Sequence, residues 1–209
     1  MDYIIERYKH LVKKADRVFE ETAKKYADCI KCELHCADCC HAMFGLFAIE
    51  AYYIKKEFDK LDDGVKESAL ERAKLAEKEL RDLEIKLRKE REKGGKTPQQ
   101  SLSTLRVRCP LLDEKDECIL YEHRPLTCRV YGIPTSIKGK AHVCWKSDFK
   151  PGNYYPVYNL DEAYQELFYL SRQLISWEGG KELGKASLLV SVPKCISTST
   201  EELLEEVFK

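Results

Sequence analysis

Five cysteines within twelve residues constrain this chain more than any other feature of its sequence. They are Cys29, Cys32, Cys36, Cys39 and Cys40. If the segment is helical, the spacing of three and four places all of them except Cys39 on one face. Thiolates brought this close repel one another unless a cation neutralises them, and soft sulfur ligands select zinc, copper(I) or iron–sulfur clusters. The segment therefore predicts a metal site. The side chains of the adjacent residues Cys39 and Cys40 point in different directions, which favours two metal atoms or two sites.

The ten cysteines of this 209-residue chain are predicted to be metal ligands rather than disulfide partners. The residues from Met1 to Arg7 show no apolar core of a signal peptide, so a cytoplasmic, reducing location is expected. Clustered cysteines in such a compartment typically bind metal or carry out catalysis. No apolar run is long enough to span a membrane. The 36 basic residues balance the 36 acidic ones, which removes the general reason to expect nucleic-acid binding.

Helical periodicity dominates the first half of the chain. One amphipathic helix is predicted over residues 2–27, and a second from about residue 48 to residue 61. Residues 65–93 carry a heptad seam of alanine and leucine amid dense charge, which predicts a long exposed helix. This helix is expected to pack antiparallel to the first one, with a coiled-coil dimer as the alternative. A connector over residues 94–101 follows it.

The C-terminal region, residues 151–209, is also predicted to be mainly helical. Asn159 and Glu162 fit a capping arrangement that opens one helix, and a second arrangement of the same kind begins at Ser199. Between them, the apolar run over residues 188–192 indicates a short strand or a buried segment.

A second group of cysteines follows the long helix. Two short apolar runs flank a polar turn over residues 113–117, which predicts a β-hairpin with Cys109 and Cys118 near its ends. A turn and short helix with Cys128 come next, and Cys144 closes the group. This wide spacing is poor for an autonomous zinc ribbon, so the two groups of cysteines are expected to pool their ligands.

The two groups together resemble the YkgJ-type cysteine-cluster family, which is described as zinc- or iron-chelating. The resemblance covers roughly residues 29–45 and 105–146, and it implies metal binding by eight cysteines in a fixed order. These are Cys32, Cys36, Cys39, Cys40, Cys109, Cys118, Cys128 and Cys144. Cys29 and Cys195 are extra to the family pattern, so neither is expected to be an obligatory ligand. Larger flagellin lysine methylases carry a similar cluster and are linked to an iron–sulfur centre.

Ligand softness and spacing favour an iron–sulfur cluster, of the [4Fe-4S] type, over zinc or mononuclear iron ions. One cluster with spare ligands, two four-cysteine sites, or a cluster beside a zinc all remain open. Arg124 and Arg129 are predicted to bind the anionic cofactor or substrate, with surface ion pairing as the alternative. The spacing Cys32-x3-Cys36-x2-Cys39 also matches the three-cysteine signature of radical S-adenosylmethionine enzymes. Those enzymes resemble partial barrels of alternating strands and helices, and this sequence lacks that alternation, which argues against membership.

The sequence thus predicts one mainly α-helical domain over residues 1–209 with a small β-hairpin. It is an irregular helical fold around a metal core, from residues 29–45 and 105–146, and its long arm is a helical insertion over residues 62–95. The favoured function is redox or group-transfer chemistry, methyl transfer included, at an iron–sulfur cluster. The alternatives are a structural zinc module whose helix over residues 65–93 binds a partner protein, and a metal-handling protein that exchanges its ion.

Overall fold

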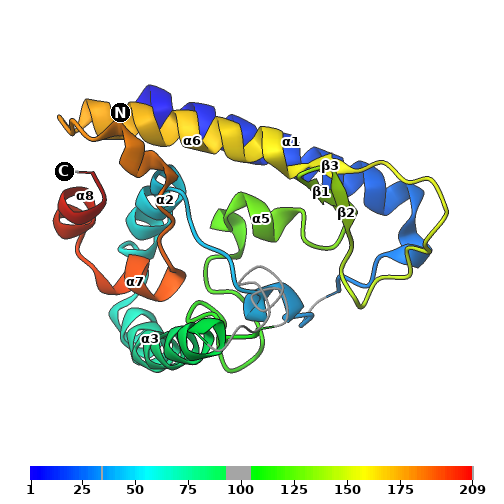
Figure 1. Cartoon of the computed structure of the whole chain (residues 1–209), viewed down its shortest axis with the longest axis horizontal. Coiled ribbons are helices and arrows are strands. Elements are labelled where there is room, and N and C mark those ends of the chain that lie inside the picture. Colours follow the sequence, from blue (N-terminus) through cyan, green and yellow to red (C-terminus); the bar gives the residue numbers. More distant parts are fainter. Residues whose placement is uncertain (34, 93–104, 209) are drawn as a thin grey trace.

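The computed structural model describes residues 1–33, 35–92 and 105–208, and these residues are mainly helical with one small sheet (Figure 1). The predicted connector over residues 94–101 lies outside the described residues. The α-helices are α1 (Asp2–Lys25), α2 (Ala48–Phe58), α3 (Asp63–Glu92), α5 (Leu126–Arg129), α6 (Leu160–Trp177), α7 (Val192–Ser197) and α8 (Thr200–Phe208). The strands are β1 (Thr135–Ile137), β2 (Lys140–His142) and β3 (Tyr158–Asn159), and 3₁₀ helices cover Ala27–Cys29, Asp38–His41, Tyr121–His123 and Leu183–Ser187.

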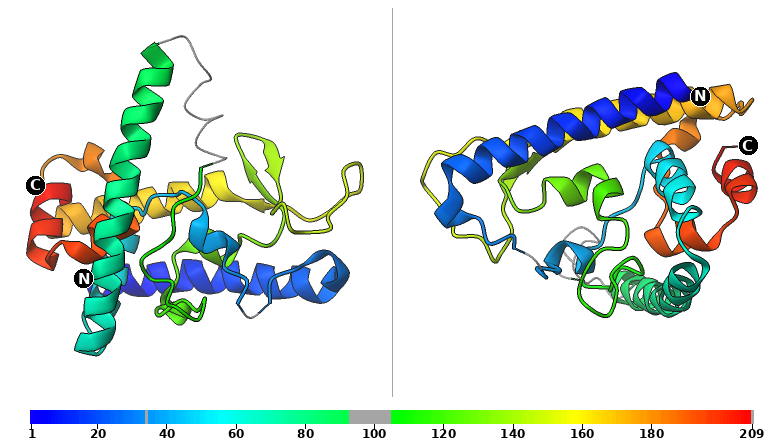
Figure 2. Two further views of the ribbon diagram at one scale, coloured as in Figure 1. Left: turned by 90° about the horizontal axis from the view of Figure 1, so that it is seen from below. Right: turned by 180° about the vertical axis from the view of Figure 1, so that it is seen from behind.

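Helices α1 and α6 lie side by side along one edge of the molecule (Figures 1 and 2). Asp2 in the first turn of α1 and Lys24 and Lys25 in its last turn complement the helix dipole. At the start of α6, the Asn159 side chain accepts hydrogen bonds from the backbone N–H groups of Asp161 and Glu162. Both helices therefore begin and end close to where the sequence predicts.

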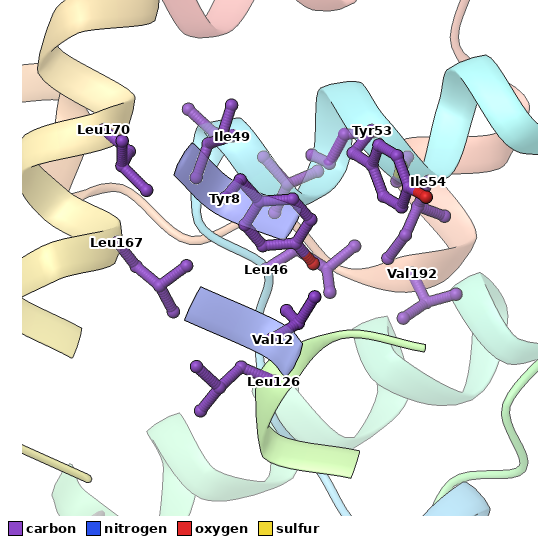
Figure 3. Close-up of a cluster of buried hydrophobic side chains, with 14 of the residues drawn as sticks. Tyr8, Val12, Leu46, Ile49, Tyr53, Ile54, Leu126, Leu167, Leu170 and Val192 are labelled. Carbon is purple, nitrogen blue, oxygen red and sulfur yellow. The ribbon is translucent and has the colours of Figure 1, made fainter. Parts of the chain in front are cut away.

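The hydrophobic core lies where α1, α2 and α6 meet (Figure 3). Tyr8 of α1, Ile49 of α2 and Leu167 of α6 are fully buried in it. Leu126, the first residue of α5, and Val192, the first residue of α7, reach the same cluster (Figure 3). This burial anchors the short helix that carries Cys128, because a fully buried side chain stabilises its position by about 2 kcal/mol.

A buried carboxyl group joins α2 to α5. Glu50 is only 2% exposed, and its Oε2 accepts a hydrogen bond from the Phe47 N–H at 3.1 Å, which caps α2. Its Oε1 accepts a second bond, from the Leu126 N–H at 2.9 Å. Burial raises the pKa of Glu50 to about 7, although these hydrogen bonds and Arg129 act in the opposite direction. Glu50 thus holds the beginning of α5 against the end of the segment that carries the first cysteines.

Helix α3 confirms the predicted length but contradicts the predicted packing. It does not lie antiparallel to α1; it runs across the direction of α1 and packs on α7 (Figure 2). Ala69 and Ala73 of its seam are fully buried and Ala76 nearly so. The prediction was wrong because a seam of small residues shows which face of a helix is covered, not which helix covers it.

The sheet has the strand order β2-β1-β3, with β1 antiparallel to β2 and parallel to β3. Lys138 and Gly139 form the tight turn between β1 and β2, both at positive φ (52° and 71°), as a two-residue hairpin turn requires. The sequence analysis did not predict this hairpin, because its strands of three residues are too short to show alternation. The predicted hairpin around residues 113–117 is present as a single antiparallel bridge between Leu112 and Cys118.

The segment before α7 closes against the end of the first cysteine segment. Leu46 and Val190 form an antiparallel bridge through two hydrogen bonds of 2.7 and 2.9 Å. Gly45 permits this approach, since a Cβ there would lie 2.5 Å from the Leu189 Cβ. The predicted strand over residues 188–192 is therefore one bridge, and the helix that follows it was not predicted. No described helix is sufficiently long and apolar to cross a lipid bilayer.

Glu50→Ala should lower the free energy of unfolding by about 3 kcal/mol, because it leaves two buried N–H groups without an acceptor. Chemical denaturation at neutral pH measures this loss. Glu79→Ala, on the exposed side of α3, is the control and should change stability by less than about 0.5 kcal/mol. Equal stability of the two variants would contradict the role of Glu50.

Candidate metal centre

The first cysteine segment does not form one helix. A 3₁₀ helix ends at Cys29 and another begins at Asp38, and residues 30–33 and 35–37 form neither helix nor strand. His35 has a positive φ of 66°, in the left-handed region of backbone conformation. The cysteines are consequently not aligned on one helical face, and the contacts that bring them together come from other parts of the chain.

Backbone hydrogen bonds join the two groups of cysteines directly. The Cys109 N–H donates to the Cys40 carbonyl at 2.7 Å, and the Val107 N–H donates to the His41 carbonyl at 3.1 Å. Ala42 and Arg106 form an antiparallel bridge beside them. One predicted ligand from each group is therefore held by the same ladder, and that the two groups pool their ligands stays a prediction.

All eight predicted ligands line one or both of two adjoining cavities, of about 670 and 720 Å³, which we call the apolar cavity and, for its many charged lining residues, the charged cavity. The residues that line both cavities are Cys39, Cys40, Cys118 and Cys128. Cys109 lines the apolar cavity, and Cys32, Cys36 and Cys144 line the charged one. The four cysteines that line both cavities therefore lie in the wall that the cavities share.

The two extra cysteines line neither of these cavities. Cys195 is fully buried in the core, and its Sγ donates to the Ala51 carbonyl at 3.2 Å. Cys29 ends a 3₁₀ helix, and its carbonyl accepts a hydrogen bond from the Asp148 N–H at 2.8 Å. That neither cysteine is an obligatory ligand stays a prediction.

The environment of the thiols opposes their ionisation. Burial, together with neighbouring thiols, raises the pKa of Cys109 to about 12 and that of Cys32 to about 11, and it raises the pKa of Cys128 strongly. Between the adjacent cysteines, a hydrogen bond from Cys40 lowers the pKa of Cys39 to about 7 and raises that of Cys40. Most of these thiols are protonated at neutral pH, so a bound cation would have to displace protons.

The donor set, eight thiols, suits a soft metal by its chemistry. Among the described residues, no three His, Cys, Asp or Glu side chains are arranged to hold a single ion. A zinc ion needs its sulfur ligands at about 2.3 Å, so the thiols would have to draw closer together to bind one.

Asp38 links three segments that carry predicted ligands. Its Oδ2 accepts a hydrogen bond from the Tyr131 hydroxyl at 2.9 Å, and its Oδ1 accepts one from the Trp145 Nε1–H at 2.9 Å. The Cys144 Sγ lies 3.7 Å from Oδ2. Burial alone would raise the pKa of Asp38, but the two hydrogen bonds outweigh it and lower the pKa. Asp38 was not predicted as a site residue. Its position between Cys36 and Cys39 in the sequence is the signal that could have identified it.

The two predicted cofactor-binding arginines differ in their surroundings. Arg129 donates to the Asp16 carboxylate at 2.7 Å and to the carbonyls of Arg124 and Glu122 at 2.7 and 2.6 Å, which ties α5 to α1. Arg124 lies over the Tyr121 ring at 3.7 Å and lines both cavities. Arg129 also lines the cavity of about 720 Å³, so both arginines lie near thiols, and the hydrogen bonds of Arg129 in addition position the helix that carries Cys128.

Gly132 makes room for a thiol. A Cβ at this position would overlap with the Cys32 Sγ and would lie 3.3 Å from the Phe19 ring. The backbone after α5 therefore approaches Cys32 more closely than any residue with a side chain could. This is a second position that the sequence analysis did not identify.

One comparison with known proteins gives a match. The family model CxxCxxCC, described as "Putative zinc- or iron-chelating domain", matches residues 28–145. No curated protein and no solved structure matches the chain at a significant level. The matched range includes all eight predicted ligands and ends just after Cys144.

Gly132→Ala should weaken metal retention by about tenfold, because the new methyl group displaces the Cys32 thiol. The measurement is the rate at which a chromophoric chelator removes metal from the purified protein. Gly184→Ala introduces a methyl group with no atom within 4 Å and should behave like the wild type. Identical rates for all three proteins would exclude Cys32 from the centre.

Proposed function

This chain belongs to the CxxCxxCC family of zinc- or iron-chelating domains, and from that premise we propose that its cysteines hold an iron–sulfur cluster that serves redox or group-transfer chemistry. The observation that carries the proposal is the position of Cys39, Cys40, Cys118 and Cys128 in the wall between two cavities. Four cysteines are the usual ligand set of a [4Fe-4S] cluster. Zinc or mononuclear iron is the alternative.

The protein's own groups have separate tasks in this proposal. The cysteine thiolates hold the cluster, and the backbone pairing of Cys40 with Cys109 fixes the two ligand segments relative to each other. Arg124 offsets the negative charge of the thiolates. Such a cluster, when bound, supplies one-electron transfer. The cavities on either side of the shared wall give a reactant access to it.

Protein purified without oxygen should be brown and should contain iron and acid-labile sulfide in similar amounts. Cys128→Ser should abolish incorporation of the centre and lower the stability of the fold, because metal binding contributes directly to folding free energy. The measurements are the visible absorption spectrum, iron and sulfide analysis, and chemical denaturation.

Cys195→Ser is the matched control, because it removes one buried thiol that lines neither cavity. Its iron and sulfide content should equal that of the wild type. A colourless wild-type protein that contains zinc would favour the alternative. Loss of the centre in Cys195→Ser, or its retention in Cys128→Ser, would contradict the ligand assignment.

A further inference from the structure

The apolar cavity has the properties of a small-molecule site. Its volume of about 670 Å³ falls within the range of ligand pockets, which are typically apolar with a few polar groups. One wall is a single face of α3, where Glu77, Leu80, Arg81 and Glu84 follow the spacing of residues that share a helix face. The distal part of α3 is thus a wall of this cavity.

The remaining walls are largely hydrophobic. They come from the segment after the first cysteines, from α2, and from the residues before and within α7. Phe44, Ile54, Leu120, Leu189 and Val192 are among the side chains that line the cavity. An occupant with an apolar body would bury its surface here, at a gain of about 25 cal/mol per Å² removed from water.

The charged groups of the cavity favour an anion. Four cationic side chains line it, those of Arg81, Arg108, Arg124 and Lys194, against the carboxylates of Glu77 and Glu84. Arg108 donates to the Asp113 carbonyl at 2.6 Å and pairs with Asp116 at 3.8 Å, outside the cavity, and Arg124 is assigned to the thiolates. Arg81 is held only loosely by Glu77, with 3.8 Å between its Nη1 and the carboxylate oxygen. Guanidinium groups bind carboxylates through paired hydrogen bonds, so Arg81 suits one carboxylate head group.

The thiols connect this cavity to the candidate centre. The thiols of the shared wall, with Cys109, line this cavity together with residues of α3 and α7. A molecule bound in the cavity would therefore lie against the residues proposed to hold the metal.

We propose that the apolar cavity binds a small amphipathic carboxylate, with its apolar body against α3 and α7 and its head group at Arg81. The placement of this molecule beside a cluster rests on the proposed function; the binding itself does not. The cavity makes α3, which the sequence suggests is an arm, part of a substrate site.

The test is isothermal titration calorimetry of the metal-loaded full chain, with decanoate as the probe and decyltrimethylammonium as its cationic counterpart. Decanoate should bind, and the cation should bind at least about tenfold more weakly. Arg81→Gln should weaken decanoate binding about tenfold through the loss of a charge-assisted hydrogen bond. Arg88→Gln is the matched control, because Arg88 lies on the same helix, pairs with Glu92 at 3.5 Å and does not line the cavity.

A second pair of variants tests the cavity itself. Leu80→Trp should fill the space and abolish decanoate binding, whereas Leu75→Trp, at a position of the same helix that is 71% exposed, should leave it unchanged. Equal binding of decanoate and the cation, no decanoate binding by the wild type, or no effect of Leu80→Trp would overturn the proposal.

Metal content separates the two proposals. Arg81→Gln and Leu80→Trp should keep the metal content of the wild type. A wild-type protein that holds its metal but does not bind decanoate would refute the cavity proposal alone. A wild-type protein that holds no metal but binds decanoate with the expected dependence on Arg81 and Leu80 would refute the metal-centre proposal and support the cavity.

Discussion

The structure depends on the backbone pairing between residues that are some seventy positions apart, in which Cys40 accepts from Cys109 and His41 accepts from Val107. This short ladder brings the two groups of cysteines together. Thiols concentrated in this way are costly to ionise without a cation, as the raised pKa of Cys109 indicates. A metal that neutralises them would stabilise the fold together with the site.

The hydrophobic core and the thiol cluster support each other through α5. Leu126 places the first turn of this helix in the core, Glu50 accepts its first N–H, and Arg129 ties its end to α1. Cys128 is consequently held by a rigid element, whereas Cys32 and Cys36 lie on irregular backbone.

Sequence patterns predicted the long elements well because their signals are local. The apolar stripe of α1 lies within the helix, and the capping residues Asn159 and Ser199 lie directly before α6 and α8. The packing of α3 depended on a distant partner, α7, which is too short to show periodicity. The cysteine spacing predicts eight ligands, whereas Asp38, Gly132 and Glu50 act through contacts with remote residues that the fold brings close.

The central claim is that sulfur atoms from both cysteine groups surround an inorganic centre. X-ray absorption at the iron edge of protein prepared without oxygen tests it most directly, because the spectrum reports the atoms bound to the metal. The account predicts a first shell of sulfur together with a neighbouring iron atom. A shell dominated by nitrogen and oxygen, or no metal beyond trace amounts, would contradict it.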